Sequence, residues 1–139
     1  MSEVFVDASA MLAILLKEDD ARAMSRTIHA ATLKVTSPFA LLEVAAKLSD
    51  RLLPDGAAAE VRIAALLATY DIELVPVDED IGALARDAWY RYGKGRRPAR
   101  LNLGDCVAYA CARRHRLALL YKGDDFRHTD IEPALKTGT

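Results

Sequence analysis

The stretch Leu101–Phe126, LNLGDCVAYACARRHRLALLYKGDDF, predicts the fold class of this chain. Asn102 can cap a helix that has Asp105 in its first turn, and the helix ends in basic residues that suit its dipole. The apolar run Leu117–Tyr121 then predicts a buried strand, and the turn after it carries Asp124–Asp125. The stretch therefore indicates a helix–strand unit of an α/β fold with acids at both junctions. Asp105 could, however, belong only to the helix cap.

The N-terminus has a similar acid after an apolar run. Glu3–Asp7, EVFVD, predicts a central strand because it is short, apolar and rich in β-branched and aromatic residues. The strand ends on Asp7, and Ser9 can cap the following helix, AMLAILLK. Ligands of open α/β sheets bind at the carboxyl ends of strands, where Asp7 would lie. Asp7 could equally do no more than cap the helix.

The segments between these two stretches alternate between helix and strand patterns. Ser37–Pro38 predicts a helix start, with serine as the cap and proline at the first helical position. Asp19 or Asp20 and Asp78 are further candidate helix caps. We expect additional strands at 33–36 and 72–77, and a short edge strand in the tail after 127. This alternation also predicts an α/β fold with a parallel sheet.

Composition limits the possible classes of protein. A chain of 139 residues is long enough for one core, so we expect a single domain over residues 1–139. The net charge of −1 argues against coating of nucleic acid by bulk positive charge, but permits a local basic patch. No apolar run approaches a membrane span and no signal peptide is evident, so we expect a soluble, cytoplasmic protein. Cys106 and Cys111 match no zinc spacing and are predicted to be buried free thiols.

Two further segments could contribute to a functional site. Glu43 lies among apolar neighbours in its helix, where it could pair with Lys47 or bind a metal ion. The loop Gly93–Arg100, GKGRRPAR, is the most positive segment of the chain. Its cations could bind phosphates or could simply be solvated. Aromatic residues just before this loop, at Trp89, Tyr90 and Tyr92, could stack on bases, although packing is the more common role of such residues.

The pattern of acids suggests a metal site. Asp7 and Asp124–Asp125 follow strands, and Asp105 opens the helix between them, so parallel topology would gather them at one edge. Carboxylates at such close range repel and raise one another's pKa unless a cation lies among them. An all-oxygen site without His or Cys suits Mg²⁺ or Mn²⁺, which can activate water and neutralise charge on a phosphate. With the basic loop alongside, the site predicts phosphodiester hydrolysis.

Four pieces of the sequence also resemble a known family, in order and over nearly the whole chain. They are FVDASA, Glu43 in the helix after Ser37, YGKGRRPARLNLGDCVAYACA and LLYKGDDFRHTDI. In these pieces the chain resembles PIN-domain ribonucleases, specifically VapC-type toxins of bacterial and archaeal toxin–antitoxin pairs. The resemblance implies a single PIN domain with a Rossmann-like α/β/α sandwich, whose central, mostly parallel sheet is flanked by helices. It further implies a Mg²⁺- or Mn²⁺-dependent endoribonuclease that forms a homodimer and is inhibited by a VapB-type antitoxin.

The resemblance also implies roles for particular residues. Asp7, Glu43 and Asp105 match the metal-site acids, and Asp125 fits the fourth acid of the family's DF pair. Asp7 and Asp105 would be direct ligands, and Glu43 and Asp125 would complete the site directly or through water. Asp124 would be an assisting acid, and Ser9 matches a hydroxyl residue that orients the first aspartate. From the basic composition of the loop beside these acids, and not from the resemblance, we expect four cations to bind RNA: Lys94, Arg96, Arg97 and Arg100. Ala8 departs from the family's frequent threonine, which removes a possible hydrogen bond but no ligand.

Three other functions remain open from the sequence. A Mg²⁺-dependent phosphatase or phosphoacceptor domain needs a lysine opposite its aspartate; Lys122 could serve, but the DxD opening is absent after Asp7. A non-catalytic binding module on the same fold would not need four mutually repelling carboxylates. A housekeeping ribonuclease would lack a neighbouring antitoxin gene. No His or Lys is placed as an evident general base, so that role would fall to metal-bound hydroxide.

Overall fold

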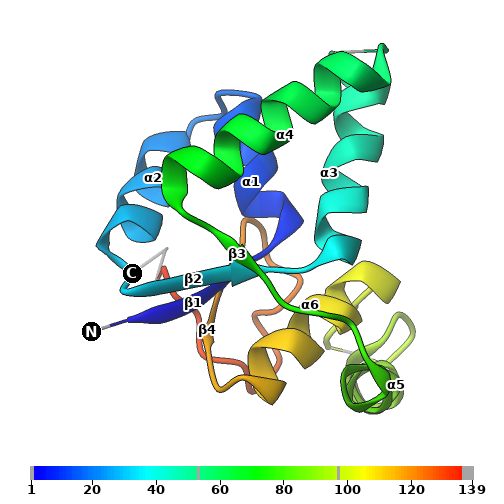
Figure 1. Ribbon diagram of the computed structural model, residues 1–139. Helices are drawn as coiled ribbons and strands as arrows, with labels where there is room; N and C mark the ends of the chain where they lie inside the picture. The colour runs from blue at the N-terminus through cyan, green and yellow to red at the C-terminus, as the bar shows by residue number, and fades with distance from the viewer. Residues whose placement is uncertain (1, 53, 97, 136–139) are drawn as a thin grey trace.

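A parallel four-stranded sheet with β1 (Glu3–Val6) in its interior forms the centre of the fold (Figure 1). The computed structural model describes residues 2–52, 54–96 and 98–135. The strand order is β3-β2-β1-β4, and the other strands are β2 (Leu33–Thr36), β3 (Glu73–Leu74) and β4 (Ala118–Leu120). Phe5 of β1 pairs with Val35 of β2 on one side and with Leu119 of β4 on the other. The direction of strand addition reverses between β1 and β4, which is where sheets of this type bind ligands.

Helices cover both faces of the sheet. The connections from β1 through β2 to β3 contain α1 (Ala8–Leu15), α2 (Ala21–Ala30), α3 (Pro38–Arg51) and α4 (Gly56–Tyr70). The return from β3 to β4 contains α5 (Glu79–Tyr92) and α6 (Leu103–Arg114). Right-handed crossovers in opposite directions put these two sets of helices on opposite faces, with α1, α2 and α4 above the strands and α6 below them in Figure 1. The predicted α/β/α sandwich is therefore confirmed.

Local capping chemistry starts α3, α5 and α6 where the sequence predicts, whereas Asp20 precedes α2 without a side-chain capping hydrogen bond. Ser37 accepts from the Ala40 amide at 3.0 Å, and Asp78 accepts from the Ile81 amide at 3.0 Å. Asn102 and Asp105 form a reciprocal capping box at the start of α6. This capping box places Asp105 in the first turn of α6, where its carboxylate binds the backbone of Asn102.

Three predictions about the elements were wrong. Asp7, not Ser9, caps α1, because the Asp7 carboxylate accepts from the Ser9 amide at 3.1 Å. Strand β3 covers only Glu73–Leu74 instead of residues 72–77, since its partner β2 already ends at Thr36. The tail forms no edge strand in the part that the structure describes, but only an isolated parallel bridge between Leu119 and Pro133.

The core is built on β1 and α6. Three consecutive residues of β1, Val4 to Val6, are fully buried. Most of α6 is buried as well, and small side chains let the helix lie close to the sheet. Cys106 and Cys111 of this helix are buried free thiols, as predicted. Over residues 2–52, 54–96 and 98–135, no helix has the length and hydrophobicity needed to span a membrane.

Candidate active site

Asp7 lies at the carboxyl end of β1, beside the segment that leaves β4. Its side chain is only 5% exposed, and its backbone amide donates to the Leu120 carbonyl at 2.9 Å. Ser9 donates its hydroxyl to the Asp7 carboxylate at 2.5 Å and accepts from the Lys122 amide at 2.9 Å. Asp7 therefore both caps α1 and lies at the ligand-binding edge of the sheet. Ser9 holds this carboxylate in place and ties it to the loop after β4.

Asp105 enters the same region from the first turn of α6. Its side chain is 8% exposed and accepts from the Asn102 amide at 3.1 Å. Burial raises the pKa of Asp105 to about 8; the hydrogen bond from Asn102 opposes the rise, whereas a hydrogen bond shared with Asp125 and the charges of Asp7 and Asp125 add to it. Asp105 is thus a cap residue that also contacts other carboxylates.

Glu43 reaches the site from α3. Burial raises the pKa of Glu43 to about 7, the charge of Asp7 adds to the rise, and Lys47 opposes it without cancelling it. Gly104 leaves the room that this side chain occupies, because a Cβ atom on Gly104 would lie 2.7 Å from the Glu43 Cδ atom. Glu43 therefore packs against the first turn of α6. Glu43 thus lies within the electrostatic reach of both Asp7 and Lys47, and its role as a metal ligand stays a prediction.

The two acids after β4 differ from each other. Gly123 has a φ of +100°, in the left-handed region, which allows the chain to turn sharply before them. Asp125 shares a hydrogen bond with Asp105 and helps to raise the pKa of Asp7, which burial raises first. The side chain of Asp124 is 87% exposed, and it pairs with Arg127 at 3.9 Å. Asp125 is therefore the better candidate for the fourth acid.

The structure thus brings four predicted acids from four different segments into one electrostatically coupled group: Asp7, Glu43, Asp105 and Asp125. Their oxygen-only chemistry fits a hard divalent cation, and burial together with neighbouring negative charge raises the pKa of Asp7, Glu43 and Asp105. Within the described parts of the chain, no three Asp, Glu, His or Cys side chains converge closely enough to hold an ion as they stand. Their roles as ligands stay predictions.

Comparisons with known proteins show the family to which the chain belongs. A family model of the PIN domain matches residues 4–132. This chain belongs to the PIN-domain family. It is 36% identical over 126 residues to ribonuclease VapC30 of Mycobacterium tuberculosis, covering 91% of this chain and 94% of the relative. It is 37% identical to ribonuclease VapC of Mycolicibacterium smegmatis, covering 91% and 95%. Within the PIN-domain family, the chain therefore belongs to the VapC ribonucleases.

Solved structures share the same PIN fold. The crystal structure of Mycobacterium tuberculosis VapC20, described as a sarcin–ricin loop cleaving toxin, superposes with a TM-score of 0.75 at 19% identity. That alignment covers 93% of this chain and 96% of the other. The VapBC2 structure from Rickettsia felis gives a TM-score of 0.70 at 10% identity, covering 94% and 95%. At these identities, the likeness extends to the fold alone.

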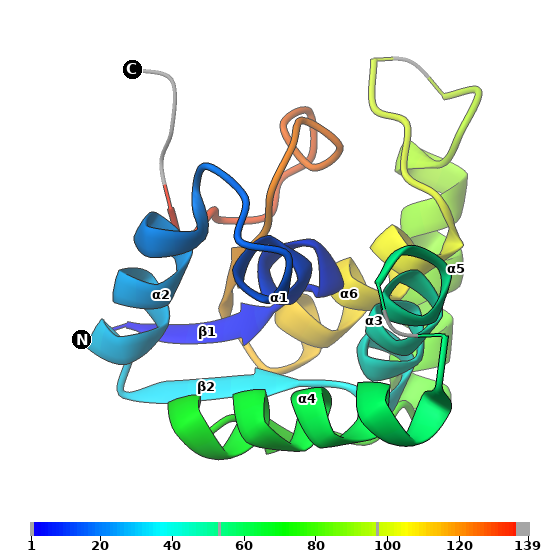
Figure 2. The same cartoon turned by 90° about the horizontal axis from the view of Figure 1, so that it is seen from above.

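A polar cleft opens beside the acids of this PIN domain. It has a volume of about 570 Å³ and lies between the loop after α5 and the loop after β4, which both project at the top of Figure 2. The residues that line it are Lys94, Pro98, Arg100, Asn102, Asp124, Asp125, Arg127 and His128. Two of the predicted RNA-binding cations, Lys94 and Arg100, thus lie on one wall. Arg96 does not line this cleft, and Arg97 lies outside the described residues.

Sequence reasoning missed the opposite wall of the cleft. Arg127 and His128 come immediately after the DDF motif, and both line the cleft together with Asp125. A basic pair directly after the acids was the available signal. Lys122, in contrast, is not a phosphoacceptor lysine opposite Asp7, because its ammonium group pairs with Glu18 at 2.8 Å and with Asp20 at 3.4 Å. The phosphatase alternative therefore loses the residue on which it depended.

An apolar groove lies elsewhere on this PIN domain, between α3, α5 and α6. It has a volume of about 340 Å³, and its lining includes Phe39, Trp89, Tyr90, Leu103 and Val107. Tyr90 is 63% exposed and Leu103 is 68% exposed, which is unusual for large apolar side chains. Trp89 and Tyr90 thus line an apolar groove and are not among the residues that line the polar cleft.

Proposed function

We propose that this chain is a Mg²⁺- or Mn²⁺-dependent endoribonuclease that acts as the toxin of a toxin–antitoxin pair. Membership of the VapC ribonuclease family confirms the ribonuclease function that the sequence predicts. The observation that carries the detailed proposal is the coupled group of four carboxylates with a basic cleft beside it. A coupled group of carboxylates suits a divalent cation, and flanking cations suit a phosphodiester chain.

Each acid has a part in this proposal. Asp7, Glu43, Asp105 and Asp125 would hold the ion, with Ser9 fixing Asp7 and Asn102 fixing Asp105 through their hydrogen bonds. When bound, Mg²⁺ or Mn²⁺ supplies an activated water and neutralises charge on the phosphate. Asp124 lies at the cleft wall and would assist only indirectly.

The cleft would bind the phosphates on either side of the scissile bond. Lys94 and Arg100 on one wall and Arg127 and His128 on the other can donate to phosphate oxygens from two directions. Contacts of this kind position the RNA without reading its sequence. We keep Arg96 and Arg97 as further phosphate contacts on the same loop.

Protein partners are also part of the proposal. Solved structures with this fold include a toxin–antitoxin complex from Klebsiella pneumoniae and a DNA-bound VapBC from Salmonella typhimurium. By analogy, a VapB-type antitoxin would inhibit this chain. We further propose that the chain forms a homodimer, for which the apolar groove is the candidate surface. A single domain over residues 1–139 and a cytoplasmic location complete the proposal.

Cleavage of total cellular RNA by partner-free protein tests the function directly. In Mg²⁺ or Mn²⁺ we expect discrete fragments, and these should vanish with EDTA or in the Asp105→Asn variant. Asp50→Asn, which changes an exposed acid of α3 away from the site, is the matched control and should cleave like the wild type. Intact RNA after incubation with folded, metal-bound protein would contradict the proposal and favour a binding module.

A further inference from the structure

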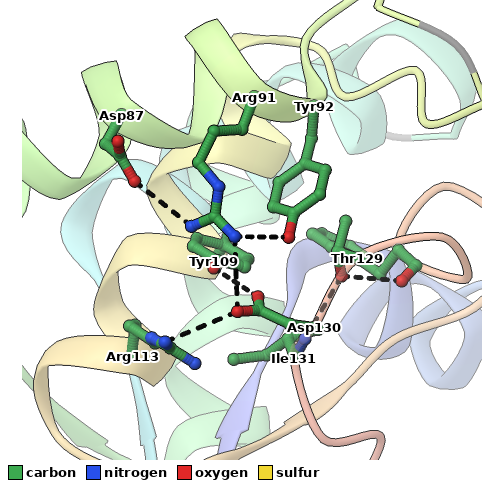
Figure 3. Close-up of polar contacts among 9 residues, drawn as sticks. Asp87, Arg91, Tyr92, Tyr109, Arg113, Thr129, Asp130 and Ile131 are labelled. Carbon is green, nitrogen blue, oxygen red and sulfur yellow. Dashed lines mark hydrogen bonds and ion pairs between the residues drawn. The ribbon is translucent and has the colours of Figure 1, made fainter.

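Figure 3 shows a polar cluster around Asp130 that includes side chains of α5 and α6. Tyr109 donates its hydroxyl to one Asp130 carboxylate oxygen at 2.5 Å. Two guanidinium groups approach the other oxygen, Arg91 at 3.5 Å and Arg113 at 3.4 Å. We call these four residues the Asp130 junction. Burial opposes the charge on Asp130, but the Tyr109 hydrogen bond and both arginines outweigh it and lower the pKa, so the carboxylate stays ionised.

The junction joins three elements that each carry one part of the site. Tyr109 lies on α6, one helical turn after Asp105. Arg91 lies in the last turn of α5, immediately before the loop that carries the basic wall of the cleft. Asp130 closes the loop after β4 that carries Asp125. A change at this point would therefore alter the spacing between acids and cations.

Contacts at the start, in the middle and at the end hold the loop between β4 and Asp130. At its start, the Lys122 amide donates to Ser9. In its middle, Phe126 is 3% exposed and packs on Tyr121, with ring centroids 4.9 Å apart. At its end, Thr129 donates its hydroxyl to the Phe126 carbonyl at 2.8 Å, directly beside Asp130. Asp125 thus lies on a short segment whose far end is held by the junction.

Packing of α5 on α6 does not by itself explain the junction. Asp80, in the first turn of α5, and Arg114, at the end of α6, already form an ion pair at 3.5 Å between these two helices. The Asp130 carboxylate adds a contact of a different kind, because it ties the loop after β4 to both helices at once. Asp80 and Asp130 therefore offer a matched comparison between a purely helical contact and a loop contact.

We propose that Asp130 is a positioning residue of the ribonuclease. By binding Tyr109 of α6 and Arg91 of α5, it fixes Asp125 relative to Asp105 and to the basic wall of the cleft. It does not itself touch substrate or metal. This inference rests on the function proposed above, because Asp130 is proposed to position groups that take part in RNA cleavage.

The test compares Asp130→Ala, Asp130→Asn and the control Asp80→Ala by three measurements. They are kcat and KM for RNA cleavage, the Mn²⁺ dissociation constant by calorimetry, and the thermal midpoint. For Asp130→Ala we expect kcat to fall by about 10- to 100-fold, because displacement of a reacting group by about 1 Å costs that much. We expect Mn²⁺ binding to weaken by about tenfold, as when an outer partner of a ligand is lost. KM should change little, since the cleft cations remain.

The other variants separate positioning from stability. Asp130→Asn keeps an acceptor for Tyr109 and should recover a large part of both kcat and Mn²⁺ affinity, even if Asp130→Ala does not fold. Asp80→Ala should lower the thermal midpoint slightly and leave the other two measurements unchanged. Wild-type kcat and Mn²⁺ affinity in folded Asp130→Ala and Asp130→Asn would overturn the inference but not the ribonuclease. A wild-type protein that neither cleaves RNA nor binds Mn²⁺ would overturn both.

Discussion

Replacement of Gly104 by alanine should separate activity from stability. The new Cβ atom would clash with the Glu43 Oε2 atom and would lie 2.7 Å from the Glu43 Cδ atom, whereas carbon atoms pack comfortably at about 3.5 Å, so the Glu43 carboxyl must retreat by about 1 Å or more. The obstacle is the end of a flexible side chain, so Glu43 can turn away while α6 keeps its place. A displacement of this size should lower kcat by about 100-fold.

Stability should change in the opposite direction. Alanine is favoured over glycine in a helix by about 1 kcal/mol, so the free energy of unfolding should stay the same or rise by up to about that amount. Gly82→Ala in α5 is the matched control, because its Cβ atom would meet nothing closer than Glu79 Oε1 at 3.5 Å. It should gain stability and keep full activity.

The assay measures RNA cleavage and urea unfolding for Gly104→Ala, Gly82→Ala and the wild type. Wild-type cleavage by Gly104→Ala would refute the reasoning, because it would mean that Glu43 need not lie against the first turn of α6. Loss of both activity and stability would also refute it, since it would place the clash in the backbone and not in the Glu43 side chain.

Two further predictions concern charge. In EDTA, the free energy of unfolding should fall as the pH rises from about 5 to about 8. Because the pKa values of Glu43 and Asp105 are raised to about 7 and about 8, the folded state retains protons that the unfolded state has lost. Urea titrations at a series of pH values measure this, and constant or rising stability would contradict the prediction. Arg127→Ala, made in the inactive Asp105→Asn protein, should reduce the slope of log K for RNA binding against log salt concentration by about 0.7. Arg22→Ala on α2 is the control and should leave this slope unchanged. An unaltered slope for Arg127→Ala would show that this wall of the cleft does not bind RNA.

Most of the fold was predictable because its boundaries are set locally. Ser37, Asp78 and Asn102 each cap a helix within three residues of their own position, so the sequence contains all the necessary information. The choice between Asp7 and Ser9 as cap was not local. Ser9 is engaged by the Lys122 amide from the far end of the chain, so it orients the Asp7 carboxylate instead of capping the helix itself.

The same distinction separates the predicted and the missed residues of the site. The predicted acids at Asp7, Asp105 and Asp125 stand at junctions of strands and helices, and parallel topology brings such junctions together. The part played by Gly104 depends on a side chain from a different helix, and the junction of Tyr109 with Asp130 depends on how a loop closes. No spacing in the sequence encodes either contact.

Glu43 shows why tertiary burial outweighs a local partner. Along the helix, Lys47 lies one turn away and would favour an ordinary ion pair worth a few tenths of a kcal/mol. In the folded chain, desolvation and the negative charge of Asp7 raise the pKa of Glu43 in spite of Lys47. A chain selected for stability alone would have no reason to place Glu43 and Asp105 within electrostatic reach of Asp7, because the charge of Asp7 makes the ionisation of both less favourable. The destabilising proximity of these acids is therefore itself an argument that they serve a cation-dependent reaction.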